Sequence, residues 1–244
     1  MIPKILILGG TQEARHLANH AAKHGWNAEM SLAGVTPTPI SVDLPVRYGG
    51  FGGADGLARF LADQQITHLV DTTHPYAARM TAHAVAASDL AQVKRLSFWR
   101  PAWQADAEDL WTEYAGLADL FVDIPDHAHL FLAAGQEGIA ALPVEHKFQV
   151  TARALKAPST EGQINFIAAL PQADMEQEKQ LFEELGITHL AVKNAGGTAS
   201  FAKLLAARAL RLPVLMLARP APPPPPRYAS LDEIITALSQ AHAN

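Results

Sequence analysis

The residues best suited to chemistry near the start of the chain form a glycine turn. A run of branched apolar residues, Ile5 to Leu8, stops at a glycine pair, and a helical pattern begins at once. The first amides of a helix have no partner within the helix and lie at the positive end of its dipole, so they favour a phosphate group. We therefore expect a dinucleotide's diphosphate to be held by Gly9, Gly10, Thr11, Glu13, Ala14 and Arg15. The alternative is a plain turn of an α/β domain that binds no nucleotide.

The next candidate group lies at the end of the second expected strand, residues 27–32. In an NAD site an acid near this strand end accepts the ribose hydroxyls. Here Ser31 stands near the end, and Glu29 is two residues too early. A small hydroxyl removes repulsion toward a 2′-phosphate, which favours NADPH, with NADH as the alternative. We expect Ser31 and Arg47 to meet the adenosine ribose and its phosphate.

Four glycines in five positions, Gly49, Gly50, Gly52 and Gly53, surround Phe51. Such a loop loses much backbone entropy on folding unless its conformation is required. We expect it to press against the cofactor with Phe51 exposed on it. The alternative is an ordinary surface turn.

Another expected strand, residues 66–71, leads to Thr73, His74, Pro75 and Tyr76. Ligands of open α/β sheets bind beyond the carboxyl ends of the strands. Pro75 suits the first turn of a helix, so Thr73 or His74 should lie near its N-cap. This position makes His74 a candidate catalytic residue, although a lone histidine often has only a structural role.

Composition narrows the class of protein. The chain has 244 residues, no cysteine and a formal net charge of -5. The absence of cysteine excludes disulfides, thiolate metal sites and cysteine nucleophiles, and we expect no metal. The negative net charge does not indicate binding to nucleic acid, and no apolar run is long enough for a membrane span. We expect a cytoplasmic protein without a signal peptide.

Charge is unevenly distributed along the second half. Acids without any Lys or Arg lie between Arg100 and Lys147, and bases without any acid lie between Glu184 and Asp232. One interpretation is that the acidic stretch forms one solvated face and the basic stretch forms another. The other is that the basic stretch faces a polyanionic ligand, because local potential acts on a ligand more than net charge does.

A tetrapeptide occurs twice, at residues 66–69 and 187–190, each time at the start of an expected strand. Coincidence is one explanation, but the repeat also indicates two similar doubly wound halves. After the second copy come Lys193, Asn194, Gly196 and Gly197, which would bind anions through amides and an ammonium group.

The chain should close with a last strand over residues 213–219, a stiff proline connector and a helix over 231–241. Weak patterning from residue 100 to 126 places the domain boundary near 125. We therefore predict a dinucleotide-binding domain over residues 1–125 and a substrate-side domain over residues 126–244.

Five ordered stretches now stand together: residues 8–15, 49–53, 71–77, 193–197 and 219–220. Each alone is weak, but the ordered set resembles the precorrin-6A reductases of cobalamin biosynthesis over essentially the whole chain. The resemblance implies an α/β fold of two Rossmann-like, doubly wound halves with mostly parallel sheets and a cleft between them. It implies reduction of one carbon–carbon double bond of a corrin precursor by a reduced nicotinamide nucleotide.

The resemblance also assigns roles to residues. The cofactor should meet the glycine turn, the Gly49–Gly53 loop, Ser31, Arg47 and Thr73. The carboxylates of an anionic corrin-type tetrapyrrole should meet a second set, namely His74, Tyr76, Lys193, Asn194, Gly196, Gly197, Lys203 and Arg219. Transient contact with neighbouring pathway enzymes is a further expectation.

Two departures from the family pattern are visible. Ala195 stands where the family usually has serine, and Tyr76 stands where it often has Phe. The family has a cobalt-free and a cobalt-bearing branch, and the sequence does not separate them.

The sequence also bears on two other functions. A short-chain dehydrogenase needs a Tyr-x-x-x-Lys pair, and none of the tyrosines has Lys four residues later. A non-catalytic module that senses nucleotide or carries tetrapyrrole remains the alternative.

Overall fold

The computed structural model describes residues 2–33, 41–154, 164–198 and 200–243, and the chain divides into two compact units. Unit 1 comprises residues 1–101 and 220–244, and unit 2 comprises residues 102–219. This division differs from the boundary expected near residue 125. The C-terminal segment returns to unit 1, where Arg227 and Tyr228 pair with Ser97 and Phe98.

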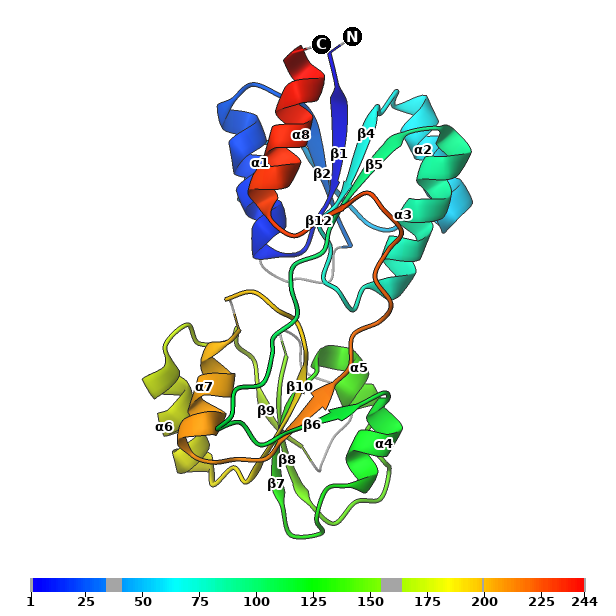
Figure 1. Cartoon of the computed structure of the whole chain (residues 1–244). Helices are drawn as coiled ribbons and strands as arrows, with labels where there is room; N and C mark the ends of the chain where they lie inside the picture. The colour runs from blue at the N-terminus through cyan, green and yellow to red at the C-terminus, as the bar shows by residue number, and fades with distance from the viewer. Residues whose placement is uncertain (1, 34–40, 155–163, 199, 244) are drawn as a thin grey trace. The chain divides into compact units, whose positions relative to one another are not determined.

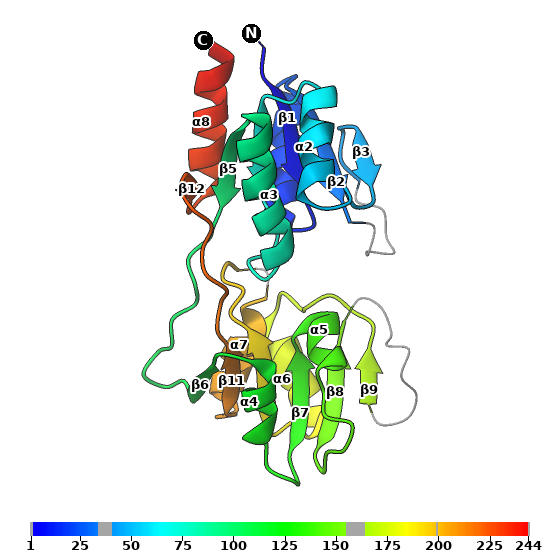
Figure 2. The same cartoon turned by 90° about the vertical axis from the view of Figure 1, so that its right-hand side faces the viewer.

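Unit 1 is built on a parallel sheet of six strands in the order β12-β5-β4-β1-β2-β3. Its strands are β1 (Lys4–Leu8), β2 (Asn27–Leu32), β3 (Val46–Tyr48), β4 (His68–Asp71), β5 (Lys94–Phe98) and β12 (Arg227–Tyr228). Read from β3, this is the Rossmann order, with β12 in the sixth place. Figure 2 shows β3 at one edge of this sheet.

Two helices cover each face of this sheet (Figure 1). They are α1 (Gln12–Lys23) and α8 (Leu231–Ala243) on one face, and α2 (Ala54–Asp63) and α3 (Ala78–Ala91) on the other. The strands are apolar on both faces because both are buried, as in other all-parallel sheets.

Unit 2 repeats the plan, with a parallel sheet in the order β6-β11-β10-β7-β8-β9. Its strands are β6 (Trp111–Tyr114), β7 (His129–Ala133), β8 (Gln149–Arg153), β9 (Ile164–Ile167), β10 (His189–Lys193) and β11 (Val214–Leu217). Its helices are α4 (Leu117–Val122) and α5 (Gly135–Ala140) on one face, and α6 (Met175–Leu185) and α7 (Ala202–Ala209) on the other. Two Rossmann-like, doubly wound α/β halves are therefore confirmed.

The repeated tetrapeptide occupies equivalent places at the starts of β4 and β10. The Thr67 hydroxyl accepts from the Lys4 amide at 2.9 Å, and the Thr188 hydroxyl accepts from the His129 amide at 2.9 Å. Each threonine thus ties its strand to the neighbouring strand of the sheet, β1 in unit 1 and β7 in unit 2.

Several elements differ from the sequence-based predictions. β6, α4 and β12 were not predicted, and α3 begins at Ala78, after a turn in which the Ala77 amide donates to the His74 carbonyl. The N-cap of α3 is Ala77, three residues beyond His74, so the helix begins later than expected. In the part of the chain that the structure describes, each helix is too short or too polar to cross a membrane.

Candidate functional site

The turn between β1 and α1 has one packed and one open glycine. A Cβ on Gly9 would lie 2.9 Å from the end of the Met30 side chain and 3.0 Å from that of Leu32, so side chains of β2 pack closely against this glycine. Gly10 has φ of +116°, and a Cβ there would meet nothing within 4 Å. Space above Gly10 and a left-handed backbone are what a close ligand approach needs.

Thr11 caps the helix that follows this turn. Its hydroxyl accepts from the Ala14 amide at 3.1 Å and donates to the Thr72 carbonyl at 2.8 Å. The Thr72 hydroxyl in turn donates to the Leu8 carbonyl at 2.7 Å. The loops after β1 and β4 are therefore locked together. Among the predicted turn residues, Ala14 is buried and Arg15 is exposed.

Ser31 and Arg47 meet at the carboxyl ends of β2 and β3. The Ser31 hydroxyl accepts from Arg47 Nη1 at 2.9 Å, and the same guanidinium donates to the carbonyls of Gly49 and Gly50. Ser31 is buried, whereas Arg47 is half-buried. Arg47 is therefore the more accessible of the two side chains to a ligand.

Phe51 is half-buried, so the expectation that it is exposed was wrong. Its ring lies 5.2 Å from the Phe60 ring, and the Arg47 guanidinium carbon stands 3.9 Å from its centre. Gly56, which sequence reasoning missed, makes this packing possible, because a Cβ there would lie 1.7 Å from the Phe51 carbonyl oxygen. The glycine loop is thus held on α2, and Arg47 is stacked on it by a cation–π contact.

A buried carboxylate organises the loop after β4. Asp71 Oδ1 accepts from the Thr73 amide at 3.1 Å and from the Thr73 hydroxyl at 2.7 Å. His74 Nδ1 accepts from the Tyr76 amide at 3.3 Å. In the neutral imidazole this contact favours the proton on Nε2. Asp71 was missed as a site residue, although it ends the strand that presents His74.

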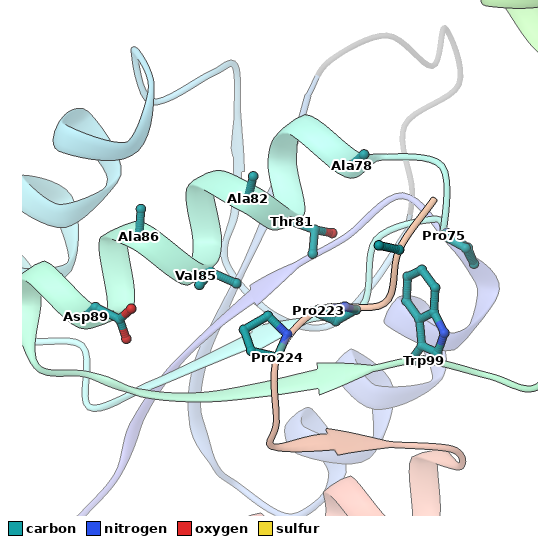
Figure 3. A pocket seen from close by; sticks show the side chains of 11 residues that line it. Pro75, Ala78, Thr81, Ala82, Val85, Ala86, Asp89, Trp99, Pro223 and Pro224 are labelled. Atoms are coloured by element: carbon teal, nitrogen blue, oxygen red, sulfur yellow. The ribbon is translucent and has the colours of Figure 1, made fainter. Parts of the chain in front are cut away.

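An apolar cavity of about 440 Å³ lies beside this loop within unit 1 (Figure 3). One face of α3, from Ala78 to Asp89, forms a wall, and Pro75 and Trp99 also line the cavity. Pro223 and Pro224 of the proline segment line the remaining side. The segment is fixed in place because Arg95 Nη2 donates to the carbonyls of Pro224 and Pro225.

Glu13 does not stand alone at the glycine turn. Its Oε1 lies 2.5 Å from Nη1 of Arg100, and the two side chains are 21% and 10% exposed. Arg100 was not predicted as a site residue. A signal was present in the sequence, because Arg100-Pro101 and Arg219-Pro220 each begin two residues after strands that hold equivalent places in the two sheets, β5 and β11.

In unit 2 the predicted residues after β10 make many contacts with their own unit. The Asn194 side chain accepts from the Trp103 amide at 2.8 Å and donates to the Trp103 carbonyl at 3.1 Å. The Trp103 indole donates to the Gly197 carbonyl at 2.7 Å. Asn194 and Gly197 therefore hold the segment that enters unit 2, and Gly196, with φ of +68°, turns the backbone between them.

Two predicted cations lie near this turn. Arg219 donates to the carbonyls of Asn194 and Ala195 and lines a cavity of about 410 Å³ with Trp103 and Trp111. Lys193 Nζ lies 2.6 Å from Oε2 of Glu137. Both side chains are held near the carboxyl edge of the sheet of unit 2.

Lys203, which was expected to face the substrate carboxylates, is buried, with 5% exposed. Burial lowers its pKa to about 8, against the opposing attraction of Glu178, and Arg153 lowers it further. Its ammonium donates to the Ser200 carbonyl at 2.8 Å.

The basic stretch of unit 2 is partly neutralised by the acidic one. Arg208 donates to both carboxylate oxygens of Asp109 at 2.9 Å, which raises the pKa of Arg208. Lys193 is likewise paired with Glu137. The basic stretch therefore does not form a uniformly basic face.

The family model described as "Precorrin-6x reductase CbiJ/CobK" matches residues 4–239. The chain is 37% identical over 240 residues to the precorrin-6A reductase of Rhodobacter capsulatus, covering 97% of this chain and 96% of that protein. It is 37% identical over 240 residues, with the same coverage, to the precorrin-6A reductase of Rhodococcus erythropolis. The cobalt-precorrin-6A reductase of Priestia megaterium is 23% identical over 253 residues, covering 96% and 97%.

Among solved structures, one described as "CobK precorrin-6A reductase" is similar over the whole chain. It matches with a TM-score of 0.89 and 36% identity, covering 98% of this chain and 96% of that one.

Proposed function

This chain belongs to the precorrin-6x reductase family, and on that premise we propose that it reduces precorrin-6A to precorrin-6B with NADPH in cobalamin biosynthesis. As a reductase it is an oxidoreductase, and the bond reduced is a carbon–carbon double bond of the macrocycle. The observation that carries the proposal is the open Gly10 turn at the β1–β4 switch point of a Rossmann-ordered sheet. Dinucleotides bind at this point in such sheets.

Unit 1 has features that fit a dinucleotide. The diphosphate would lie on the amides that open α1, next to Gly10, where there is space for it. The adenosine ribose would lie toward β2 and β3, beside Arg47 and Ser31. An arginine held in place by carbonyls and an aromatic ring is suited to bind the 2′-phosphate of NADPH.

The reduced nicotinamide, when bound, supplies the hydride, and the protein supplies orientation and field. The nicotinamide end would lie toward the loop after β4, which Asp71 and Thr73 hold in shape. The carbon next to the one reduced would take its proton either from water or, when its imidazole is charged, from His74, which that loop presents. The carboxylates of the substrate would be met by cations such as Lys193 and Arg219.

Precorrin-6A is favoured over its cobalt form as the substrate. The relatives that are named precorrin-6A reductase and cover the chain almost completely are 35–37% identical, whereas the cobalt-precorrin-6A reductase is 23% identical. This comparison supports the cobalt-free branch.

The test is a reaction mixture of the purified chain, precorrin-6A and either coenzyme. We expect the nicotinamide absorbance to fall only when protein and precorrin-6A are both present, and faster with NADPH than with NADH. A non-catalytic carrier would bind the pigment without oxidising NADPH, and that result would overturn the proposal.

A further inference from the structure

The ion pair between Glu13 and Arg100 joins two distant parts of unit 1. Glu13 lies in the first turn of α1, and Arg100 follows β5, which is separated from β1 by β4 in the sheet. The Arg100 side chain therefore reaches across the carboxyl edge of the sheet to the glycine turn. The side chains of Arg100 and Glu13 are 10% and 21% exposed, and their contact is 2.5 Å, so this pair is more shielded from solvent than a surface salt bridge.

Glu13 has opposite effects on the helix and on an anionic ligand. A carboxylate in the first turn is favourable for α1, because it lies at the positive end of the helix dipole. The same carboxylate would repel a diphosphate that binds the amides of that turn. The repulsion would be strong, because charges that are partly buried are poorly screened.

We propose that Arg100 is a positioning residue that neutralises Glu13, so that the turn can accept the diphosphate of either coenzyme. This inference rests on the proposed function. Arg100 acts through Glu13, whereas Arg47 acts on the 2′-phosphate, so the two arginines have separable effects. Arg100 sets affinity for NADPH and NADH equally, and Arg47 sets the preference between them.

The second unit contains a similar pair. Glu137 lies in the first turn of α5, which follows β7, as Glu13 lies in the first turn of α1, and Glu137 lies 2.6 Å from the Lys193 ammonium. In both units a glutamate in the first turn of a helix is thus paired with a cation from the carboxyl end of another strand, which is β5 in unit 1 and β10 in unit 2. This recurrence supports neutralisation of the glutamate as the function of the cation.

The test is a double-mutant cycle on coenzyme binding, measured by fluorescence titration without substrate. Arg100→Met keeps the apolar stem and removes the charge, and it should weaken NADPH and NADH by a similar factor of about tenfold. Adding Glu13→Gln should restore both affinities to within about threefold of wild type. Arg47→Met, as the matched control, should weaken NADPH alone.

Each result decides the inference. Unchanged affinities in Arg100→Met would overturn it, and so would failure of Glu13→Gln to restore binding, since Arg100 would then contact the ligand directly. If Arg100→Met does not fold, Glu13→Gln alone is used: binding of both coenzymes at wild-type strength or tighter supports neutralisation, and weaker binding contradicts it. A wild-type protein that bound neither coenzyme would overturn the proposed function as well.

Discussion

The Thr11 hydroxyl donates a hydrogen bond of 2.8 Å to the Thr72 carbonyl, 61 residues away along the chain. The same hydroxyl accepts from the Ala14 amide and so caps α1. One side chain thus fixes the glycine turn and the loop that presents His74 relative to each other. The proposed diphosphate and nicotinamide positions depend on this connection.

Replacement of Thr11 by valine should destabilise unit 1 by about 1–3 kcal/mol, from a lost helix cap and a lost hydrogen bond. Hydrogen exchange of the β1 and β4 amides would measure the loss. Thr11→Ser keeps both bonds and is the control. Equal protection in the valine variant would show that the two loops are held by other contacts.

Arg47→Met should shift the coenzyme preference from NADPH toward NADH. Loss of a charge-assisted contact to the 2′-phosphate should weaken NADPH by about tenfold to a hundredfold and leave NADH nearly unchanged. Titration calorimetry with both coenzymes would measure this, with the exposed Arg59→Met as control. A similar loss for both coenzymes would place Arg47 away from the 2′-phosphate.

His74→Ala should lower kcat by about 10²–10⁴-fold with little change in KM, which is the usual contribution of a general acid. Steady-state rates with saturating NADPH and varied precorrin-6A would separate the two constants. The exposed His16→Ala is the control. A change confined to KM would make His74 a binding residue only.

Lys203 should give the protein a distinctive stability profile at high pH. Its pKa is about 8 in the folded chain and near 10.5 when unfolded. Between these values the unfolded state binds more protons, so the contribution of Lys203 to stability rises with pH in this window. Below pH 8 both states carry the charge, and the cost of burying it is present in full.

Lys203→Met should remove this rise. The free energy of unfolding, measured by denaturant at several pH values from 7 to about 10.5, would be compared between the two proteins. Parallel curves for wild type and variant would mean that Lys203 titrates normally in the folded chain.

Local signals explain why some elements were predicted well. Residues 27–32 form β2 as expected, and α6 ends at Gly186, which adopts the left-handed conformation of a helix stop. The capping box that opens α8 is also present, because the Ser230 hydroxyl accepts from the Glu233 amide at 3.3 Å. These features depend on residues close together in the sequence.

The missed elements depend on distant partners. β6 is mostly exposed and is fixed by pairing with β11, about a hundred residues later. β12 is two residues long and exists as a strand through its pairing with β5. No local periodicity indicates either strand, which is why the expected domain boundary differed from the structure.

Site residues were likewise harder to predict where they depend on partners distant in the sequence. Ser31 and Arg47 were expected to act together, and neighbouring strands do bring them within 2.9 Å. Arg100 was missed because its partner Glu13 is 87 residues away. Lys203 was expected to face the substrate carboxylates, but α7 buries it, although lysine is rarely buried.

The central claim is that the turn after β1 binds the diphosphate of the coenzyme. Amide chemical shifts of the ¹⁵N-labelled protein, followed during titration with NADP⁺, test this most directly. We predict the largest changes at Gly10, Thr11, Gln12 and Glu13. Changes that spare this turn and concentrate at residues 134–138, the equivalent turn of unit 2, would contradict it.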